Sequence, residues 1–450
     1  MTSQATLIVS FCKASLQIFL LLLPALISLG GALPGLRFAH AQSTPSGATT
    51  AAVAELNKGN IFEGVRQLKE IVRAEPSSGA PYFYLSTVYT VLGRSDTAHR
   101  YLETAMKANP GQGAYYDQLG LIRSREGCRP EALQAFQLAL QRGMGKGESQ
   151  AWRHIGDVYV DLFQFEKAVE AYQNAIRSDP NDADAHLALG KLYLDRNNAD
   201  RAILELSTAL KLSPDLEGVH ASLGRAWRTA GDAAAAIDIL KQGIGRNPSD
   251  QEARYVLGQT LLSVGRTDEG RREMDEYRRV QERIAQTNSL FESAVERAQA
   301  GELDRAENLL NETLRLAPQY APALRVLGLV LLNRGNTQRA LEMLQQALAS
   351  NSLNSETYFD MATAYFRAGK LREALEMANR ALIVEEDDAR YYSLLGDIYS
   401  KMKRPTEARS AVKRAAQLKS RPGYQMPDPY SAEMRRRADS ATVKAICGRF

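Results

Sequence analysis

The stretch SQAWRHIGDVYVDLFQFEKAVEAYQNAIRSDPN, residues 149–181, decides the fold of this chain. Its apolar and small positions recur 34 residues later: Trp152, Ile155, Gly156, Tyr159, Ala168, Tyr172, Ala175 and Pro180 correspond to His186, Leu189, Gly190, Tyr193, Ala202, Leu206, Ala209 and Pro214. Within each copy the apolar residues are spaced by three and four, which is the period of one helix face. One helical hairpin cannot bury its apolar face alone, whereas a stack of hairpins can. The pattern therefore predicts an all-α repeat array.

The same register extends along most of the chain, with copies that begin at residues 45, 79, 113, 149, 183, 217, 251, 287, 321, 355 and 389. The eighth position of every copy is small, which lets the paired helices approach closely: Ala52, Ser86, Gly120, Gly156, Gly190, Gly224, Gly258, Ala294, Gly328, Ala362 and Gly396. The fifteenth position is glycine in eight copies, where we expect a left-handed turn to end the first helix: Gly59, Gly93, Gly127, Gly231, Gly265, Gly301, Gly335 and Gly369. Prolines then end the second helix of six copies: Pro76, Pro110, Pro180, Pro214, Pro248 and Pro318.

These eleven copies resemble the tetratricopeptide repeat, a helix-turn-helix unit of 34 residues with the same small, aromatic and proline positions. The resemblance implies a right-handed superhelical solenoid of about eleven hairpins, with the first helix of each hairpin on the inner surface. We divide the array into residues 51–286, copies one to seven, and residues 287–422, copies eight to eleven. Copy seven lacks its terminal proline, so its second helix is predicted to be extended past Glu282. We interpret this extension as a soft joint or, alternatively, as a longer helix with no mechanical role.

Residues 1–41 differ from everything that follows. Lys13 is the only charged side chain before an uncharged run from Ala14 to Leu36, and Ala39-His40-Ala41 has the small residues that a signal peptidase accepts. We predict a secretory signal peptide over residues 1–41 and a polar linker over residues 42–50. The alternative is an uncleaved N-terminal anchor, because the uncharged run of 23 residues is long enough to cross a bilayer. Either interpretation exports the chain, so that it is periplasmic or secreted.

The net charge of +4 is concentrated at the C-terminal end. From Lys419 onward there are seven basic and three acidic residues, so the array itself is close to neutral. A neutral array has no basic stripe for a polyanion, and we expect no nucleic acid partner. Residues 423–450 are a basic tail in which Ser431 to Ile446 can form a capping helix, and either this tail or the leader can contact a membrane. The two thiols after the leader, Cys128 and Cys447, are either bridged or unrelated.

The sequence contains no recognisable catalytic motif. It lacks H-E-x-x-H, G-x-S-x-G and C-x-x-C, and the glycine cluster at residues 143–147 lacks the Ser or Thr and the preceding strand of a phosphate loop. His186 and His220 occupy equivalent places in adjacent copies, where other copies have an aromatic residue, so we interpret both as packing residues rather than metal ligands. We therefore predict no catalytic residue, no metal, no cofactor and no enzymatic activity.

The resemblance implies that extended or helical peptide segments of other proteins bind the inner surface. The inner positions of each copy give these candidate partner-binding residues: Phe83, Thr87, Asp117, Arg153, Asp157, Asp161, Lys191, Arg225, Arg228, Tyr255, Phe291, Arg325, Phe359 and Phe366. Aromatic residues and arginines are common anchors at interfaces, and acidic residues in copies four and five beside Arg225 and Arg228 suggest a partner of mixed charge. For Phe291 and Phe359, packing between neighbouring hairpins is an equal alternative.

The sequence thus favours a non-catalytic extracytoplasmic scaffold or adaptor that binds partner segments in the concave groove of a superhelix. The alternative function is that of an accessory protein in envelope polysaccharide synthesis, export or pilus assembly. An enzyme, or a regulatory subunit of one, is a third hypothesis for which the chain offers no candidate residue.

Overall fold

The computed structural model describes residues 46–421, which contain 21 α-helices, one 3-10 turn and no strand. The predicted leader, the basic tail and Cys447, and with it the question of a bridge to Cys128, lie outside these residues. The helices of the first half are α2 (Gly47–Asn57), α3 (Ile61–Ala74), α4 (Gly79–Val91), α5 (Ser95–Ala108), α6 (Gly113–Arg125), α7 (Arg129–Arg142), α8 (Glu148–Asp161), α9 (Phe165–Ser178), α10 (Ala183–Asp195), α11 (Ala199–Leu212), α12 (Val219–Thr229), α13 (Ala233–Arg246) and α14 (Gln251–Ser263). Those of the second half are α15 (Thr267–Gln299), α16 (Leu303–Leu316), α17 (Ala321–Asn333), α18 (Thr337–Ser350), α19 (Ser355–Arg367), α20 (Leu371–Val384), α21 (Ala389–Lys401) and α22 (Pro405–Lys419).

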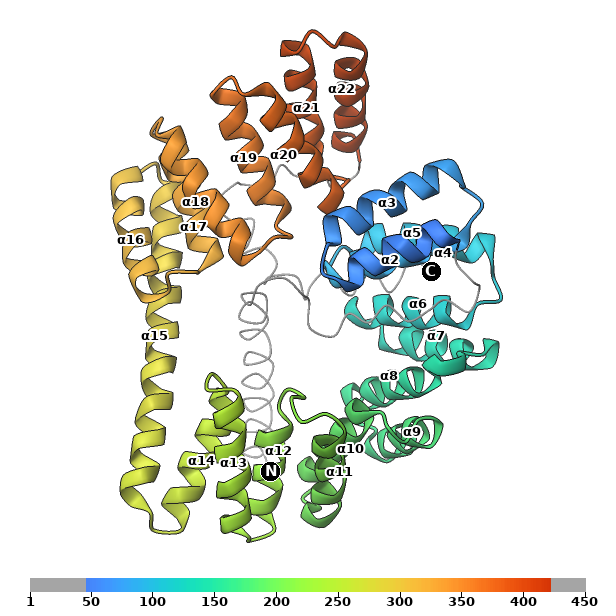
Figure 1. Cartoon of the computed structure of the whole chain (residues 1–450), viewed down its shortest axis with the longest axis vertical. Coiled ribbons are helices and arrows are strands. Elements are labelled where there is room, and N and C mark those ends of the chain that lie inside the picture. The colour runs from blue at the N-terminus through green and yellow to red at the C-terminus, as the bar shows by residue number, and fades with distance from the viewer. Residues whose placement is uncertain (1–45, 422–450) are drawn as a thin grey trace, which may run out of the picture.

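The 21 described helices pair into eleven hairpins, because the long helix α15 belongs to two of them. The hairpins stack in sequence order, from α2–α3 to α21–α22 (Figure 1). The buried apolar side chains form a succession of local clusters along the stack instead of one central core. In one of these clusters, Tyr172 of α9 meets Leu189 of α10 and Leu206 of α11. Packing between neighbours of this kind is what the 34-residue period predicts. The all-α solenoid of helical hairpins is therefore confirmed.

The turn inside each hairpin has the left-handed geometry predicted for the fifteenth position. All eight predicted glycines have a positive φ, between 70° at Gly93 and 88° at Gly231. In the three copies that lack glycine, the equivalent residues Phe163, Asn197 and Lys403 adopt φ values of 58°, 57° and 60°. The hairpin thus keeps its left-handed turn even where a side chain opposes it, because this conformation closes the first helix.

The eighth position is a close contact between the two helices of a hairpin. A Cβ atom added to Gly190 would lie 2.6 Å from Cγ of Leu206 on α11. A Cβ atom added to Gly156 would lie 2.4 Å from Cε1 of Tyr172 on α9. Protein interiors are close-packed, so a larger side chain at these positions has no room unless the helices move apart.

Helix α15 departs from the repeat pattern. It runs without interruption for 33 residues, from Thr267 to Gln299, and is both the second helix of copy seven and the first helix of copy eight. The helix is continuous because no glycine or proline occurs between Gly270 and Gly301. The extended helix predicted here is therefore longer than expected, and the boundary placed between residues 286 and 287 falls inside it.

The first helix begins inside the segment assigned above to the linker, close to residue 45, where the repeat register starts the first copy. Ser46 is the N-cap of α2, and its Oγ accepts a hydrogen bond from the backbone amide of Thr49 at 3.3 Å. The side chains of Thr49 and Ala52 are buried in the hairpin. Residues 47–50, assigned above to the linker, are therefore helical, because a capped and partly buried stretch gains from forming the first turn.

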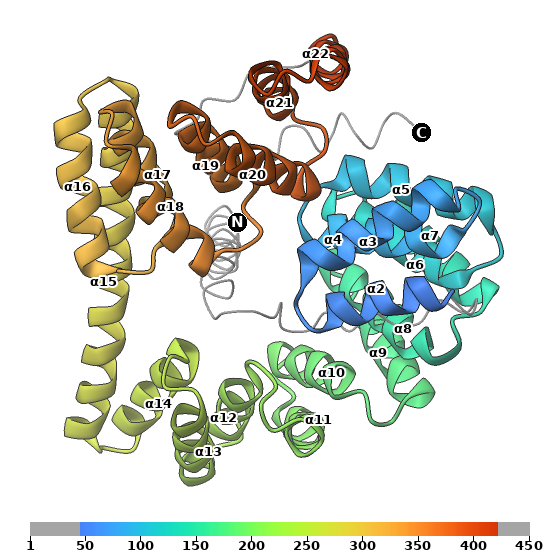
Figure 2. The ribbon, with the colours of Figure 1, turned by 45° about the horizontal axis from the view of Figure 1, so that its top comes forward.

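The array curves until its two ends meet, so the described helices form a ring (Figures 1 and 2). The aromatic ring of Phe62 on α3 meets that of Tyr358 on α19, with centroids 5.0 Å apart. The hydroxyl of Tyr89 on α4 donates a hydrogen bond to the backbone oxygen of Ile383 on α20 at 2.7 Å. We call this contact between α3–α5 and α19–α21 the seam. The repeat period alone did not predict it.

Candidate partner-binding surface

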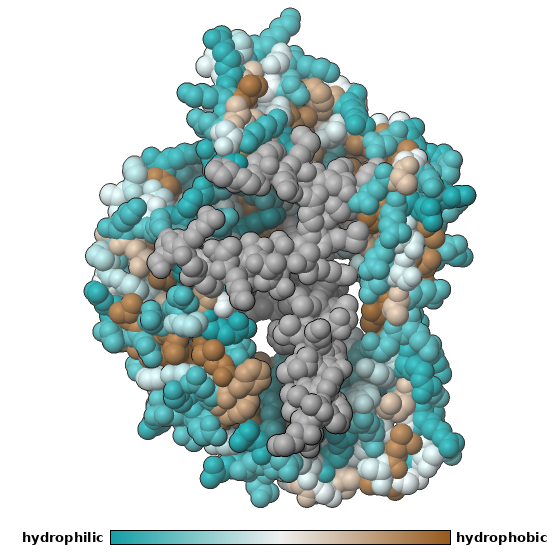
Figure 3. All heavy atoms as spheres, turned by 180° about the vertical axis from the view of Figure 1, so that it is seen from behind, coloured by the Kyte–Doolittle hydropathy of each residue, from teal (hydrophilic) through white to brown (hydrophobic). Residues whose placement is uncertain are grey.

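The first helices of the hairpins lie on the side of the array that faces the centre of the ring. Figure 2 shows α10, α12 and α17 nearer to the centre than α11, α13 and α16. Seen from behind the view of Figure 1, the surface is mainly hydrophilic, and apolar residues occur on it in small groups (Figure 3). The predicted partner-binding residues on the first helices divide into buried, half-buried and exposed groups.

Two predicted aromatic anchors are buried. Phe83 is stacked on Tyr115 of the next hairpin, with ring centroids 5.1 Å apart. Phe291 meets the ring of Tyr320 edge-on at 5.4 Å. Both residues pack between neighbouring hairpins, so their prediction as surface anchors is wrong. The reason is that inner positions close to a helix junction are covered by the following hairpin.

Two predicted charged contacts are buried as well. Asp117 is 6% exposed, and its Oδ1 lies 3.0 Å from Nδ1 of His154 on the next first helix. Arg325 is 1% exposed. Neither side chain can reach a partner on the surface, so both predictions are wrong. Both charged groups can be buried because a side chain of the neighbouring hairpin forms a hydrogen bond or an ion pair with each of them.

Besides Arg225 and Arg228, which are described below, four predicted residues are half-buried: Thr87, Arg153, Phe359 and Phe366. Phe359 and Phe366 belong to the apolar cluster of the last two hairpins, which agrees with the packing alternative for Phe359. The ammonium group of Lys401 lies over the ring of Phe366, 4.4 Å from its centroid. These four residues leave only part of their surface for a partner.

One group of predicted residues keeps at least part of each side chain in solvent, and we call it the inner polar row: the exposed Asp157, Asp161, Lys191 and Tyr255 and the half-buried Arg225 and Arg228. They lie on α8, α10, α12 and α14, the first helices of copies four to seven. Asp157, Lys191 and Arg225 occupy the same position of successive copies, so the charge along the row changes from negative to positive. The acidic and basic residues of copies four to six therefore lie along one stretch of the inner surface.

Two charged members of the row, Asp161 and Arg225, form partly exposed ion pairs with their neighbours, whereas Asp157 accepts a hydrogen bond from the hydroxyl of Tyr172 at 2.7 Å. Asp161 pairs with Arg129 at 3.0 Å, between side chains that are 47% and 39% exposed. Arg225 lies 3.5 Å from Asp195 and 3.1 Å from Glu252. Exposed ion pairs of this kind contribute about 0–1 kcal/mol. A charged partner can therefore replace these contacts at little cost.

An aromatic group ends the row at copy seven. Arg228 donates a hydrogen bond to Oε1 of Gln259 at 2.5 Å, and Gln259 donates to the hydroxyl of Tyr255 at 2.6 Å. The ring of Tyr255 lies 5.0 Å from that of Tyr277 on α15, and Tyr255 is 36% exposed. The row thus offers one exposed aromatic side chain beside its basic end.

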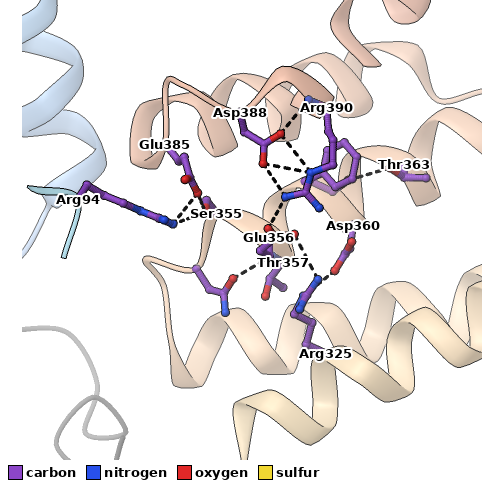
Figure 4. Close-up of polar contacts among 12 residues, drawn as sticks. Arg94, Arg325, Ser355, Glu356, Thr357, Asp360, Thr363, Glu385, Asp388 and Arg390 are labelled. Carbon is purple, nitrogen blue, oxygen red and sulfur yellow. Dashed lines mark hydrogen bonds and ion pairs between the residues drawn. The ribbon is translucent and has the colours of Figure 1, made fainter. Parts of the chain in front are cut away.

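The structure also contains a chain of buried charges that the sequence did not reveal (Figure 4). Arg325 of α17 donates through Nε to Asp360 of α19 at 2.7 Å and lies 3.4 Å from Glu356. Glu356 in turn pairs with Arg390 of α21 at 2.5 Å, and Arg390 also pairs with Asp388 at 2.5 Å. The chain joins three successive first helices through charges that are each less than a tenth exposed.

Burial raises the pKa of Asp360 to about 7, although the neighbouring guanidinium of Arg325 acts in the opposite direction. A sequence signal for this cluster exists in the register, since Arg325 holds position five of its copy while Glu356 and Asp360 hold positions two and six of the next. Position five of one copy lies next to positions two and six of the following copy in the stack. Because position five was expected to face solvent, the pairing of Arg325 with Asp360 and Glu356 was not predicted.

His186 and His220 have the packing role predicted for them. Both are 7% exposed, and Nδ1 of His186 lies 2.6 Å from Oε2 of Glu205. A Cβ atom added to Gly243 would lie 2.5 Å from Cβ of His220, so this histidine fills the space beside a glycine. Among residues 46–421, no three His, Cys, Asp or Glu side chains are grouped so that they could hold a metal ion. Within the same residues, no helix combines the length and apolar character that crossing a membrane requires.

Tetratricopeptide-repeat family models match this chain over residues 156–195, 183–216, 228–288, 291–355, 331–398 and 389–422. The human protein O-mannosyl-transferase TMTC1 is 32% identical over 119 residues, which is 26% of this chain and 13% of that protein. Anaphase-promoting complex subunit 7 of Dictyostelium discoideum is 27% identical over 111 residues, which is 25% of this chain and 19% of that protein. The chain therefore spans less than a fifth of either relative.

Two solved structures are similar in fold. YrrB, described as a TPR protein with an unusual peptide-binding site, is 18% identical, and the match covers 41% of this chain and 95% of YrrB with a TM-score of 0.33. The TPR domain of P58(IPK) is 16% identical, and the match covers 83% of this chain and 98% of that domain with a TM-score of 0.26.

Proposed function

Because the chain is an array of tetratricopeptide repeats, we propose that it is a non-catalytic scaffold that holds segments of partner proteins against the inner polar row. The observation that supports this function is the continuous row of exposed and half-buried polar side chains on four successive first helices. Most other predicted inner residues are buried or half-buried, so the row is where side chains remain available.

The row has the chemistry of a surface for a segment of mixed charge. Lys191 makes no hydrogen bond or ion pair with the described residues, and the ion pairs of Asp161 and Arg225 are largely exposed. A partner that presents basic groups to Asp157 and Asp161 and acidic groups to Lys191 and Arg225 would gain from each contact. Tyr255 would add an aromatic anchor at the basic end.

We place this function outside the cytoplasm. The support is the leader over residues 1–41, whose uncharged run and Ala39-His40-Ala41 site are typical of a secretory signal. Fusion of the full chain to a reporter enzyme that is active only after export tests the location. N-terminal sequencing of the mature protein then separates cleavage after Ala41 from an uncleaved anchor, and a reporter that stays inactive would contradict export.

Site-specific photo-cross-linking in cells tests the binding surface. A photoreactive amino acid is placed at Lys191 or Tyr255 on the row, and at the matched exposed positions Lys211 on α11 and Lys241 on α13. We expect the same captured protein from both row positions and not from the two outer ones. Equal capture at inner and outer positions would show that the row is not the binding surface.

The purified partner then allows a quantitative test. The double charge reversal K191E/R225E should weaken binding by a factor of about ten or more, since each 1.4 kcal/mol of lost interaction corresponds to tenfold. The control K211E/K241E changes the same number of charges on the outer helices and should bind like the wild type. Identical affinities for both double variants would overturn the proposal.

A further inference from the structure

The seam joins a receptor surface to one segment of the chain. The receptor, which we call the seat, lies on α3 and the α4–α5 hairpin and consists of Lys69, Tyr89, Arg94, Thr97, Arg100 and Tyr101. The segment, which we call the latch, is residues 382–387, the last turn of α20 and the acidic loop that follows it. Every residue of the latch except Val384 has a polar contact with the seat.

The seat recognises the end of a helix. The last carbonyl groups of an α-helix have no partner within the helix. The Tyr89 hydroxyl donates to the Ile383 oxygen at 2.7 Å, and Nζ of Lys69 donates to the Leu382 oxygen at 3.5 Å. A cation beside a helix C-terminus is also favoured by the helix dipole. Lys69 and Tyr89 therefore supply what the exposed end of α20 lacks.

The seat also recognises the acidic residues that follow the helix end. Glu386 accepts a hydrogen bond from the Tyr101 hydroxyl at 2.8 Å and pairs with Nζ of Lys69 at 2.8 Å. The side chains of Lys69 and Glu386 are only 17% and 22% exposed, so water and salt screen this pair less than a surface pair. One lysine thus contacts both the helix end and the acidic loop.

The two acidic residues on either side of Glu386 have separate basic partners. Glu385 pairs with Arg94 at 2.5 Å, and Asp387 pairs with Arg100. Arg94 also lies 3.3 Å from the hydroxyl of Ser355, which donates to Glu385 at 3.0 Å (Figure 4). Three successive carboxylates are therefore matched by three basic side chains of the seat.

We propose that the seat is a docking site for a helix C-terminus that continues into acidic residues, and that the chain's own latch occupies it in cis. A partner protein with such a segment competes for the same side chains and opens the ring when it displaces the latch. This site lies on the first two hairpins and shares no residue with the inner polar row. The latch has the advantage of an intramolecular ligand, which a free peptide must displace. A partner therefore binds readily only when the latch is weakened.

The test uses the full chain and a fluorescent peptide with the sequence of residues 374–390, ALEMANRALIVEEDDAR. Fluorescence anisotropy measures peptide binding, and small-angle X-ray scattering measures whether the ring is closed. The latch variant E385Q/E386Q/D387N removes three carboxylates from the latch. The seat reversal K69E/R100E is added to it, and R66E is the matched control because Arg66 lies on α3 and, among residues 46–421, pairs only with Glu63 and Glu70 of its own helix.

We expect the latch variant to have a larger radius of gyration than the wild type and to bind the peptide at least about tenfold more tightly, a change of 1.4 kcal/mol. Adding K69E/R100E should abolish that binding, whereas adding R66E should leave it unchanged. Circular dichroism establishes that each variant keeps its helices. Two results would overturn the proposal: a latch variant with the scattering and peptide affinity of the wild type, or peptide binding that survives K69E/R100E. Neither measurement involves Lys191 or Arg225, so failure here is separate from failure of the inner polar row.

Discussion

Replacing Lys403 with glycine should stabilise the last hairpin. Lys403 ends the turn after α21 with a φ of 60°, and its side chain is exposed. A side chain in the left-handed conformation costs about 1–2 kcal/mol, whereas glycine costs about 0.5–1 kcal/mol because the unfolded chain gains freedom. The difference gives a net stabilisation of about 0.5–1 kcal/mol for Lys403→Gly.

The same substitution elsewhere in the hairpin provides the control. Lys413 is also exposed but lies within α22, where glycine should destabilise by about 1 kcal/mol. Asn197→Gly should change stability little, because asparagine tolerates a positive φ. The sign of the effect therefore depends on the backbone conformation and not on the residue replaced.

The assay combines urea unfolding with hydrogen exchange of the amides in α21 and α22. Exchange is needed because the terminal hairpin of a repeat array can open without the rest. We expect slower exchange for Lys403→Gly and faster exchange for Lys413→Gly, each relative to the wild type. Equal protection, or destabilisation by both substitutions, would refute the assignment of a strained left-handed turn at Lys403.

Three further changes test the packing and the buried charges. Gly190→Leu should destabilise the protein by about 1–3 kcal/mol in urea, because even a Cβ atom would lie 2.6 Å from Leu206; an unchanged unfolding curve would contradict the repeat register. Arg325→Met should cost about 3–5 kcal/mol, because it leaves the buried carboxylates of Asp360 and Glu356 without this counterion, and adding Asp360→Asn should restore part of the loss in thermal melts. The pKa of Asp360 is raised to about 7 by burial, so its contribution to stability is present below about pH 4 and is lost as the pH rises through about 7. The urea midpoint of the wild type minus that of Asp360→Asn should therefore fall between about pH 4 and pH 7, and parallel curves would disagree with this pKa.

The candidate surface was predictable only in part. The register identified which helix of each hairpin carries inner residues, and Asp157, Lys191 and Arg225 do form a row that reaches solvent. It did not distinguish them from Phe83 and Arg325, which are buried. Whether an inner side chain is covered depends on the size and charge of the residue that meets it from the next copy. Two copies must therefore be considered together before a position can be assigned to the surface.

The continuous helix α15 shows a similar limit. The missing proline in copy seven indicated an extended helix, and that much is confirmed. The extension passes directly into the first helix of copy eight, since residues 271–300 contain neither glycine nor proline. The 34-residue period places a boundary at residue 287, whereas the glycines on either side of it, Gly270 and Gly301, lie far from that residue. Local breakers decide where a helix ends, so they outweigh the period here.

The sequence by itself determined the hairpin, its 34-residue period, the small residue at position eight and the left-handed turn at position fifteen. These features depend on residues within one copy and on the adjacent copy, so they can be read from a short stretch such as residues 149–181. Only the tertiary structure decided that the ring closes, with Tyr89 bonded to Ile383 and Glu386 held by Lys69. The relative rotation of successive hairpins accumulates along the array, and small differences in each rotation decide whether the two ends meet. No single repeat contains that information, because closure is a property of all eleven hairpins together.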